Sequence, residues 1–549
     1  MGAAMAAGDA LHHLTVSRAA DLIAAGSLSP VALVEAVLAR AADVQPIVHA
    51  YVAMQAETAL AEAHAAAAEI AAGRRRGPLH GIPFAVKDTI DTQGLPAAAG
   101  SRLRLDHVPA SDATAVHRLR QAGAILIGKL ATYEFGTGTG NDLAELPFAP
   151  ARNPWDPARL AAGSSTGAGA AVACGAALFA LGSDTGGSIR LPAASCGIIG
   201  LKPTYGLVSR AGMLPNCWSL DAAGPITWSA ADAGLVLDAI AGHDPQDPTS
   251  VAWPPGRAAA RPVRGLRIAV LRRFHERDLV ADPAIVAGFD AVVAALGRLG
   301  ATLVEVDLPA SLQDFRACNR IINISECLAA HAADYLTRRT LMGTALREKF
   351  AAGLGVSALD YLDAQRWRRV LADAVRGLFD ACDIVLCAGT TRPPPLFADR
   401  AAVAAFTAES AMAVFNVSGL PAMSVRAGFC PDGMPVGVQL AAPAFGEALL
   451  VGVAQALEEA TPWAELRPRP EAMADRQAEF PPSVTTQPDA PAAARAAAIA
   501  IANGLDPDRT DIAQIAAQVA GTAAAVARLP RPLPRTLEPL PRLAVPEPS

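Results

Sequence analysis

Apolar residues recur along the chain in two spacings. They recur at the spacing of helices that bury one face in residues 15–44, 56–73 and 112–122. Residues 81–88 and 124–129 are short continuous apolar runs, which are typical of buried strands. Strands that alternate with helices predict an α/β domain whose sheet is covered by helices on both faces.

The same alternation resumes in the second half of the chain. Helices are expected at 281–300 and 447–461, and strands at 266–271, 301–308, 383–389, 421–428 and 436–442. Polar residues mark the first helix starts: Thr15 is expected to cap one helix, and Ser29, followed by Pro30, to cap the next.

Residues 161–225 break this pattern because they are rich in Gly, Ser, Thr and Pro and yet contain apolar runs. We expect ordered loops that cross the core. The longest apolar run, 167–182, is interrupted by small residues and falls short of the roughly 20 residues that span a bilayer. It is expected to be a packed core helix.

The composition changes near residue 466, which divides the chain into three expected parts. Residues 1–466 form the main domain, and the polar, proline-rich stretch 467–487 is a linker. Residues 488–549 hold two helices and a proline-dense tail. Two small helices bury little by themselves, so this extension is expected to pack on the main domain or on a partner.

Composition excludes several classes of protein. Hydrophobic residues make up 52% of the 549 residues, which is enough for a large core. The formal charge of −6 does not indicate the positively charged surface that binds nucleic acid. The eight cysteines form no CxxC pair and have no histidine at zinc-finger spacing, so we expect reduced thiols and no metal site. The N-terminus lacks a secretory pattern, and the expected location is the cytoplasm.

Two stretches carry candidate chemistry. GSDTGGSIR, 182–190, places Ser188 behind two glycines, whose backbone amides can form a nest for an oxyanion. The same residues also fit a tight turn in which Ser188 caps the next segment. In GIPFAVKD, 81–88, Lys87 follows a buried run. It is either a lysine that pairs with Asp88 or Asp91, or a general base whose pKa is lowered by burial.

A third stretch, AGSSTGAGAAVA at 162–173, allows a different nucleophile. Its GSSTG segment fits the GxSxG pattern, which would make Ser165 the nucleophile of an α/β-hydrolase. Such an enzyme needs an acid and a histidine later in the chain. His243, His275 and His331 are available, but none has a distinguishing context.

Taken together, the three ordered stretches resemble the amidase signature family, and the similarity covers roughly residues 15–465. The resemblance implies a mixed, twisted central sheet and a Ser–Ser–Lys triad. By motif, Ser188 is the nucleophile, Ser164 the bridging serine after a cis peptide bond, and Lys87 the base. No cofactor and no metal are implied.

The resemblance also implies roles for further residues. The amides of the oxyanion hole belong to Thr185, Gly186, Gly187 and Ser188. Ser165, Asp184 and Arg190 are expected to support the loops. Tyr133, Cys217 and Trp218 are candidates for substrate binding.

The function expected from this resemblance is an amidohydrolase that cleaves a carboxylic amide or a urea-type C–N bond through an acyl-enzyme. The alternatives are a glutamine-hydrolysing subunit of a tRNA-dependent amidotransferase and a non-catalytic binding protein. The expected partner is a small amide, with no nucleic acid bound directly and no membrane, and a homodimer is the candidate assembly. Residues 488–549 resemble small accessory subunits of amidase complexes.

Overall fold

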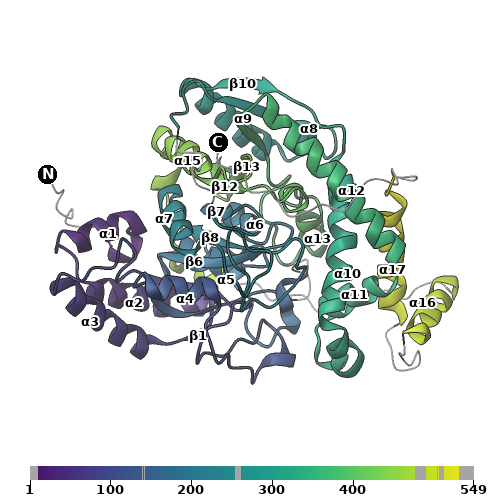
Figure 1. Ribbon diagram of the computed structural model, residues 1–549, viewed down its shortest axis with the longest axis horizontal. Helices are drawn as coiled ribbons and strands as arrows, with labels where there is room; N and C mark the ends of the chain where they lie inside the picture. The colour runs from purple at the N-terminus through teal and green to yellow at the C-terminus, as the bar shows by residue number, and fades with distance from the viewer. Residues whose placement is uncertain are drawn as a thin grey trace.

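The computed structural model shows a large sheet surrounded by helices (Figure 1) and describes residues 10–138, 140, 143–253, 261–476, 490–503, 505 and 512–530. The strands are β1 Tyr51–Met54, β2 Pro83–Lys87, β3 Ile125–Leu130, β4 Arg152–Asn153, β5 Asp156–Leu160, β6 Phe179–Asp184, β7 Ile199–Lys202, β8 Ala222–Thr227, β9 Arg267–Leu271, β10 Thr302–Glu305, β11 Ile384–Ala388, β12 Ala422–Phe429 and β13 Pro435–Ala441. The helices are α1 Val16–Ala24, α2 Pro30–Val48, α3 Ala56–Ala71, α4 Thr114–Gln121, α5 Thr166–Ala173, α6 Arg190–Cys196, α7 Ala230–Ile240, α8 Arg273–Glu276, α9 Pro283–Arg298, α10 Leu312–Arg338, α11 Thr344–Leu354, α12 Ala358–Gly377, α13 Arg400–Ala408, α14 Val414–Val417, α15 Glu447–Ala460, α16 Ala490–Ala502 and α17 Ile512–Ala527.

The central sheet has 11 strands in the order β1-β3-β2-β6-β8-β7-β12-β13-β11-β9-β10. It is mixed: β2 runs parallel to β3 and β6, and β9 runs parallel to β10 and β11, whereas the pairs between these groups are antiparallel. The expected α/β fold with a mixed sheet is therefore confirmed. The parallel pairing of β2 with β6 places the strand that ends at Lys87 beside the strand that leads to Ser188.

Helices cover both faces of the sheet, as strand β13 shows. Successive side chains of a strand point to opposite faces. Val436 contacts α9, where a side chain at Gly288 would overlap it, whereas the next residue, Gly437, lies against Ala194 of α6. Helices α6 and α9 therefore lie on opposite sides of the sheet, and β13 is buried along its whole length.

The N-terminal helices begin where their capping residues predict. The Thr15 hydroxyl accepts a hydrogen bond from the amide of Arg18 at the start of α1. Ser29 accepts one from the amide of Val31, with Pro30 as the first residue of α2. Both caps satisfy amides that have no partner within their own helix, which fixes the first turn.

Residues 161–225 differ from the expectation. This region is not a set of loops, because it contains α5, β6, α6, β7 and β8. The apolar run 167–182 is not a single helix either: α5 ends at Ala173 and strand β6 begins at Phe179. The helices are short and rich in small residues because they pack tightly against neighbouring backbone, as at Gly167, where a Cβ would lie 2.3 Å from the Ala50 carbonyl oxygen.

A separate helical layer lies beside the sheet and consists of α10, α11, α12, α16 and α17 (Figure 1). The C-terminal helices are anchored there by apolar residues: Ile515 and Val519 of α17 join a buried cluster with Leu346 and Phe350 of α11. The extension therefore packs on the main domain. The proline-dense tail from residue 531 onward and residues 477–489 of the expected linker lie outside the described residues.

Residues 467–476 of the expected linker also pack on the main domain. The guanidinium of Arg467 lies 3.5 Å from the ring centroid of Trp228, and Arg476 pairs with Asp156 at 3.1 Å.

All eight cysteines are buried and free. Within the described ranges, no helix combines the length and the apolar character that crossing a bilayer requires.

Candidate active site

Lys87 is the last residue of β2 and is completely buried. Its Nζ donates to Ser164 Oγ at 2.7 Å and to Ser183 Oγ at 2.9 Å. Burial lowers the pKa of Lys87 to about 7, against the opposing effect of the carboxylates of Asp184 and Asp221. The neutral amine is therefore well populated near neutral pH, which a general base requires.

Ser164 lies in the loop before α5, where the bond between Gly163 and Ser164 is cis, the bond that the family resemblance implies. Gly163 packs against the ring of Tyr133 so closely that a Cβ there would lie 2.4 Å from the Tyr133 Cζ. Only glycine leaves room for that ring. Tyr133 thus fixes the position of the residue that precedes Ser164.

The loop of Ser188 joins β6 to α6 and is held by Asp184. The Asp184 carboxylate accepts hydrogen bonds from the amides of Gly187 at 2.8 Å and Ile189 at 3.1 Å. It also pairs with Arg190 at 3.0 Å, and both side chains are fully buried. Burial alone would raise the pKa of Asp184, but Arg190 and the hydrogen bond from Asn416 hold that pKa well below its usual value.

One of the four amides expected in the oxyanion hole is already occupied. The amide of Gly187 donates to Asp184. The amides of Thr185, Gly186 and Ser188 donate to no other residue in the part of the chain that the structure describes. These three amides are therefore open to an acceptor, whereas that of Gly187 is not.

Ser165 contacts backbone rather than a histidine. Its hydroxyl donates to the Ser183 carbonyl at 3.3 Å, and its amide donates to the Ser188 carbonyl at 3.2 Å. These bonds join the loop of Ser164 to the loop of Ser188. The geometry of a nucleophile activated by histidine is not present at Ser165.

Ser183 is a contact of the site that the sequence did not reveal. It lies on β6, one residue before Asp184, and accepts from Lys87 at a separation of 96 residues along the chain. The contact between Ser183 and Lys87 follows from the pairing of β2 with β6, which places Val86 opposite Leu181. A sequence motif alone does not contain that pairing.

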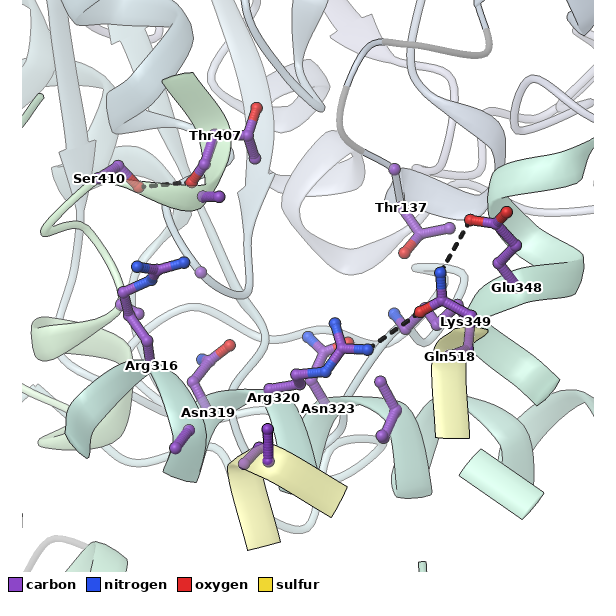
Figure 2. A pocket seen from close by; sticks show the side chains of 18 of the residues that line it. Thr137, Arg316, Asn319, Arg320, Asn323, Glu348, Lys349, Thr407, Ser410 and Gln518 are labelled. Carbon is purple, nitrogen blue, oxygen red and sulfur yellow. Dashed lines mark hydrogen bonds between the residues drawn. The ribbon is translucent and has the colours of Figure 1, made fainter. Parts of the chain in front are cut away.

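A cavity of about 560 Å³ opens beside the Ser188 loop (Figure 2). Gly186 and Thr137 line it, and helix α10 forms its floor with the side chains of Arg316, Asn319 and Arg320. The Asn319 side-chain amide donates to the Thr185 carbonyl at 3.1 Å, which joins the floor to the Ser188 loop. The cavity is therefore the space next to Ser188 into which a substrate can extend.

The expected substrate-binding residues do not line this cavity. Tyr133 belongs to an apolar cluster and lines a smaller neighbouring pocket. Cys217 is fully buried, and its thiol lies 3.1 Å from Glu326. Trp218 is 44% exposed and lines a different surface pocket with Tyr361. Most polar side chains of the cavity come instead from α10 and α11, where the sequence pattern predicts no element, and Gln518 comes from α17.

Comparison with known proteins identifies the family of the chain. The amidase family model matches residues 32–451. The chain is 37% identical over 493 residues to the A subunit of the glutamyl-tRNA(Gln) amidotransferase of Chloroflexus aurantiacus, and the match covers 84% of this chain and 99% of that protein.

Two groups of solved structures share the fold. One comes from a vestigial protein complex that reveals the evolutionary origins of an s-triazine catabolic enzyme, with 33% identity and a TM-score of 0.74, covering 81% of this chain and 98% of that one. Another is the native peptide amidase of Stenotrophomonas maltophilia, with 31% identity and a TM-score of 0.70, covering 83% of this chain and 98% of that one. Because the family model matches most of the sequence, the chain belongs to the amidase family of amide-hydrolysing enzymes.

Proposed function

We propose that the chain cleaves the C–N bond of a small carboxylic amide or urea-type substrate, with Ser188 as nucleophile, Ser164 as relay and Lys87 as base. The observation that carries the proposal is the hydrogen bond of 2.7 Å between Lys87 Nζ and Ser164 Oγ, made by a buried lysine whose pKa is lowered to about 7. That contact is what places a base beside Ser164.

Ser183 orients the neutral amine of Lys87. A neutral lysine keeps two N–H bonds and one lone pair. When it donates to Ser183, its lone pair can accept the proton of Ser164. In the proposed relay, Ser164 then takes the proton of Ser188 as the latter attacks. Ser183 is in this respect a positioning residue for Lys87.

The reaction then runs in two halves. Ser188 Oγ bonds to the carbonyl carbon, and the open amides of the Ser188 loop bind the oxyanion. The proton held by Lys87 returns through Ser164 to the leaving nitrogen, the C–N bond breaks, and an acyl-enzyme forms. Water attacks the acyl carbon by the same proton path and releases the acid.

Two substitutions test the triad. We expect Lys87→Ala and Ser164→Ala each to lower kcat by about 10²- to 10⁴-fold, the usual contribution of a general base. Ser195→Ala is the matched control, because Ser195 is also buried and its hydroxyl has no partner among the described residues. Labelling of Ser188 by a fluorophosphonate probe reports the nucleophile independently of the substrate.

An unchanged kcat in Lys87→Ala would contradict the proposed base. Labelling at Ser165 instead of Ser188 would contradict the proposed nucleophile. Loss of labelling in Ser164→Ala, with folding intact by circular dichroism, is the result expected of a relay.

A second candidate function is the hydrolysis of glutamine as the glutamine-hydrolysing subunit of a tRNA-dependent amidotransferase. The names of the relatives support this assignment more directly than a free-standing hydrolase, since the identity of 37% extends over nearly all of the Chloroflexus aurantiacus protein. The solved structures also include a peptide amidase at 31% identity. Both functions share the acyl-enzyme chemistry described above.

Ammonia release separates the two functions. A free-standing hydrolase acts on its amide without another protein. The corresponding component of an amidotransferase hydrolyses glutamine faster when its partner proteins are added. A screen of aliphatic, aryl, amino-acid and ureido amides, with Ser188→Ala as the blank, identifies which case holds.

A further inference from the structure

Two arginines on the cavity floor lack an anionic partner. Arg316 and Arg320 lie one turn apart on α10, and their side chains point into the cavity (Figure 2). No hydrogen bond or ion pair joins Arg316 to another residue of the described ranges. Arg320 donates from Nη2 to the Gln518 amide oxygen at 3.0 Å, while its Nε is buried without a partner.

The charges around these arginines do not balance within the cavity. Lys349 and Arg528 also line it, and Glu348 is its single lining carboxylate among the described residues. Arg528 is paired with Asp314 at 2.7 Å, outside the lining. Burial lowers the pKa of both Arg316 and Arg320, while Glu409 and Glu348 respectively oppose that effect. Two partly desolvated cations that form no ion pair with a carboxylate of the described residues leave room for an anion.

Helix α17 forms one wall of this cavity. Its Gln518 accepts from Arg320 and donates from Nε2 to Glu348 at 3.0 Å (Figure 2). Gln518 therefore holds the Glu348 carboxylate on its donor side and the Arg320 guanidinium on its acceptor side. Helix α17 lies outside the part of the chain that matches the family model.

The cavity connects the arginines to the nucleophile loop. Asn319 lies between Arg316 and Arg320 on α10 and donates to the Thr185 carbonyl. Gly186, whose amide is free to bind the oxyanion, belongs to the cavity lining. A substrate whose scissile carbonyl rests on this amide can place its other end against the arginines.

We propose that Arg316 and Arg320 bind a carboxylate on the amide substrate, and that α17 positions Arg320 through Gln518. The preferred substrates are then monoamides of dicarboxylic acids and related amides that carry an acidic group. A guanidinium offers paired N–H donors that match a carboxylate, which makes arginine well suited to this role. The inference rests on the proposed function because it assigns a substrate class to the same site.

Binding to the full-length Ser188→Ala protein tests the subsite without turnover. Calorimetric titration compares succinamate and glutaramate with levulinamide, in which a neutral methyl ketone replaces the carboxylate of succinamate. At least one of the two acids is expected to bind about 10- to 100-fold more tightly than levulinamide, the range for hydrogen bonds to a charged group. Equal binding, tighter binding of levulinamide, or no binding of either acid would overturn the proposal.

Arginine substitutions in the same background locate the subsite. Arg316→Gln and Arg320→Gln are expected to remove most of the preference for the acid while leaving the affinity for levulinamide unchanged. Arg338→Gln is the matched control, since Arg338 belongs to the same helix, is 48% exposed and pairs with Asp334 outside the cavity. A preference that survives in both arginine variants would overturn the proposal.

Gln518→Leu tests the contribution of α17. In the active enzyme it is expected to raise KM for the acidic amide several-fold and to leave kcat unchanged, because Arg320 loses its orientation but the triad does not. A lowered kcat with unchanged KM would contradict the positioning role. Selective binding of the acids by a protein that hydrolyses no amide would refute the proposed function and leave the subsite standing.

Discussion

Replacing Lys87 by methionine should stabilise the fold while it removes activity. The pKa of Lys87 falls from 10.5 to about 7 on folding because the amine is buried. At 1.36 kcal/mol per unit, this shift disfavours the folded state by about 5 kcal/mol when the amine is charged. Methionine has a similar length and brings no charge into the core.

The sign of the effect sets its pH dependence. Between pH 7 and 10.5 the unfolded lysine binds a proton that the folded lysine does not, so the stability of the native protein rises with pH in this window. The free-energy cost of burying the charged amine is fully present below pH 7 and decreases by about 1.4 kcal/mol per pH unit above it. The electrostatic advantage of Lys87→Met is therefore largest at pH 7 and below and disappears near pH 10.5, and the net advantage, once the lost hydrogen bonds are subtracted, disappears at about pH 9.

Part of the gain is offset by broken hydrogen bonds. Ser164 and Ser183 each lose the lysine as a partner, which costs about 1 kcal/mol apiece. The expected net stabilisation at pH 7 is about 2 to 3 kcal/mol, measured from urea midpoints at several pH values. Lys129→Met is the contrasting control: Lys129 pairs with buried Asp88 at 3.7 Å, so its loss leaves an uncompensated carboxylate and should destabilise the fold.

A Lys87→Met protein that is less stable than the native protein at pH 7 would refute this prediction. A difference in stability that does not change from pH 7 to pH 10 would refute it as well. Either result would mean that the amine is charged and well paired in the folded state, which would remove the basis for its role as a base.

Three other outcomes are expected. The kcat/KM of the native enzyme should rise with pH through about 7 and level off above it, since Lys87 must be neutral to accept a proton; a pH–rate profile without this rise contradicts the assignment. Asp184→Asn should lower stability by about 3 to 5 kcal/mol in a denaturant titration, because it leaves the buried Arg190 without its carboxylate, and a loss below about 1 kcal/mol would refute that pairing. Gly163→Ala should abolish turnover while the protein remains expressed, because the new methyl group would overlap the Tyr133 ring; near-native kcat would show that the loop adapts.

Much of the core of the site could be anticipated from local sequence. Lys87 ends a short apolar run, and such a run predicts a buried strand with its polar residue at the edge. Ser164 and Ser188 stand in glycine-rich turns that precede short helices. These features depend on residues adjacent in the chain, and the sequence is sufficient for them.

The cavity could not be anticipated because it depends on packing between distant segments. Arg316 and Arg320 are spaced as neighbours on one helical face, and a polar face of that kind usually points to water. Here this face is covered by α17, which packs against α10 and α11, and by residues 407–413. Likewise, Ser183 reaches Lys87 only through the pairing of β6 with β2, which the alternation of helices and strands does not specify.

The position of Gln518 on the same polypeptide as Ser188 has a consequence for the behaviour of the protein in dilute solution. If a separate protein supplied this side of the cavity, it would dissociate when its concentration fell below the dissociation constant of the complex. Because α17 is covalently linked to the catalytic domain, its effective concentration at the cavity does not change on dilution. Each protein molecule likewise carries one Gln518 for each Ser188. The selectivity of the enzyme for acidic amides should therefore be the same at nanomolar and micromolar protein.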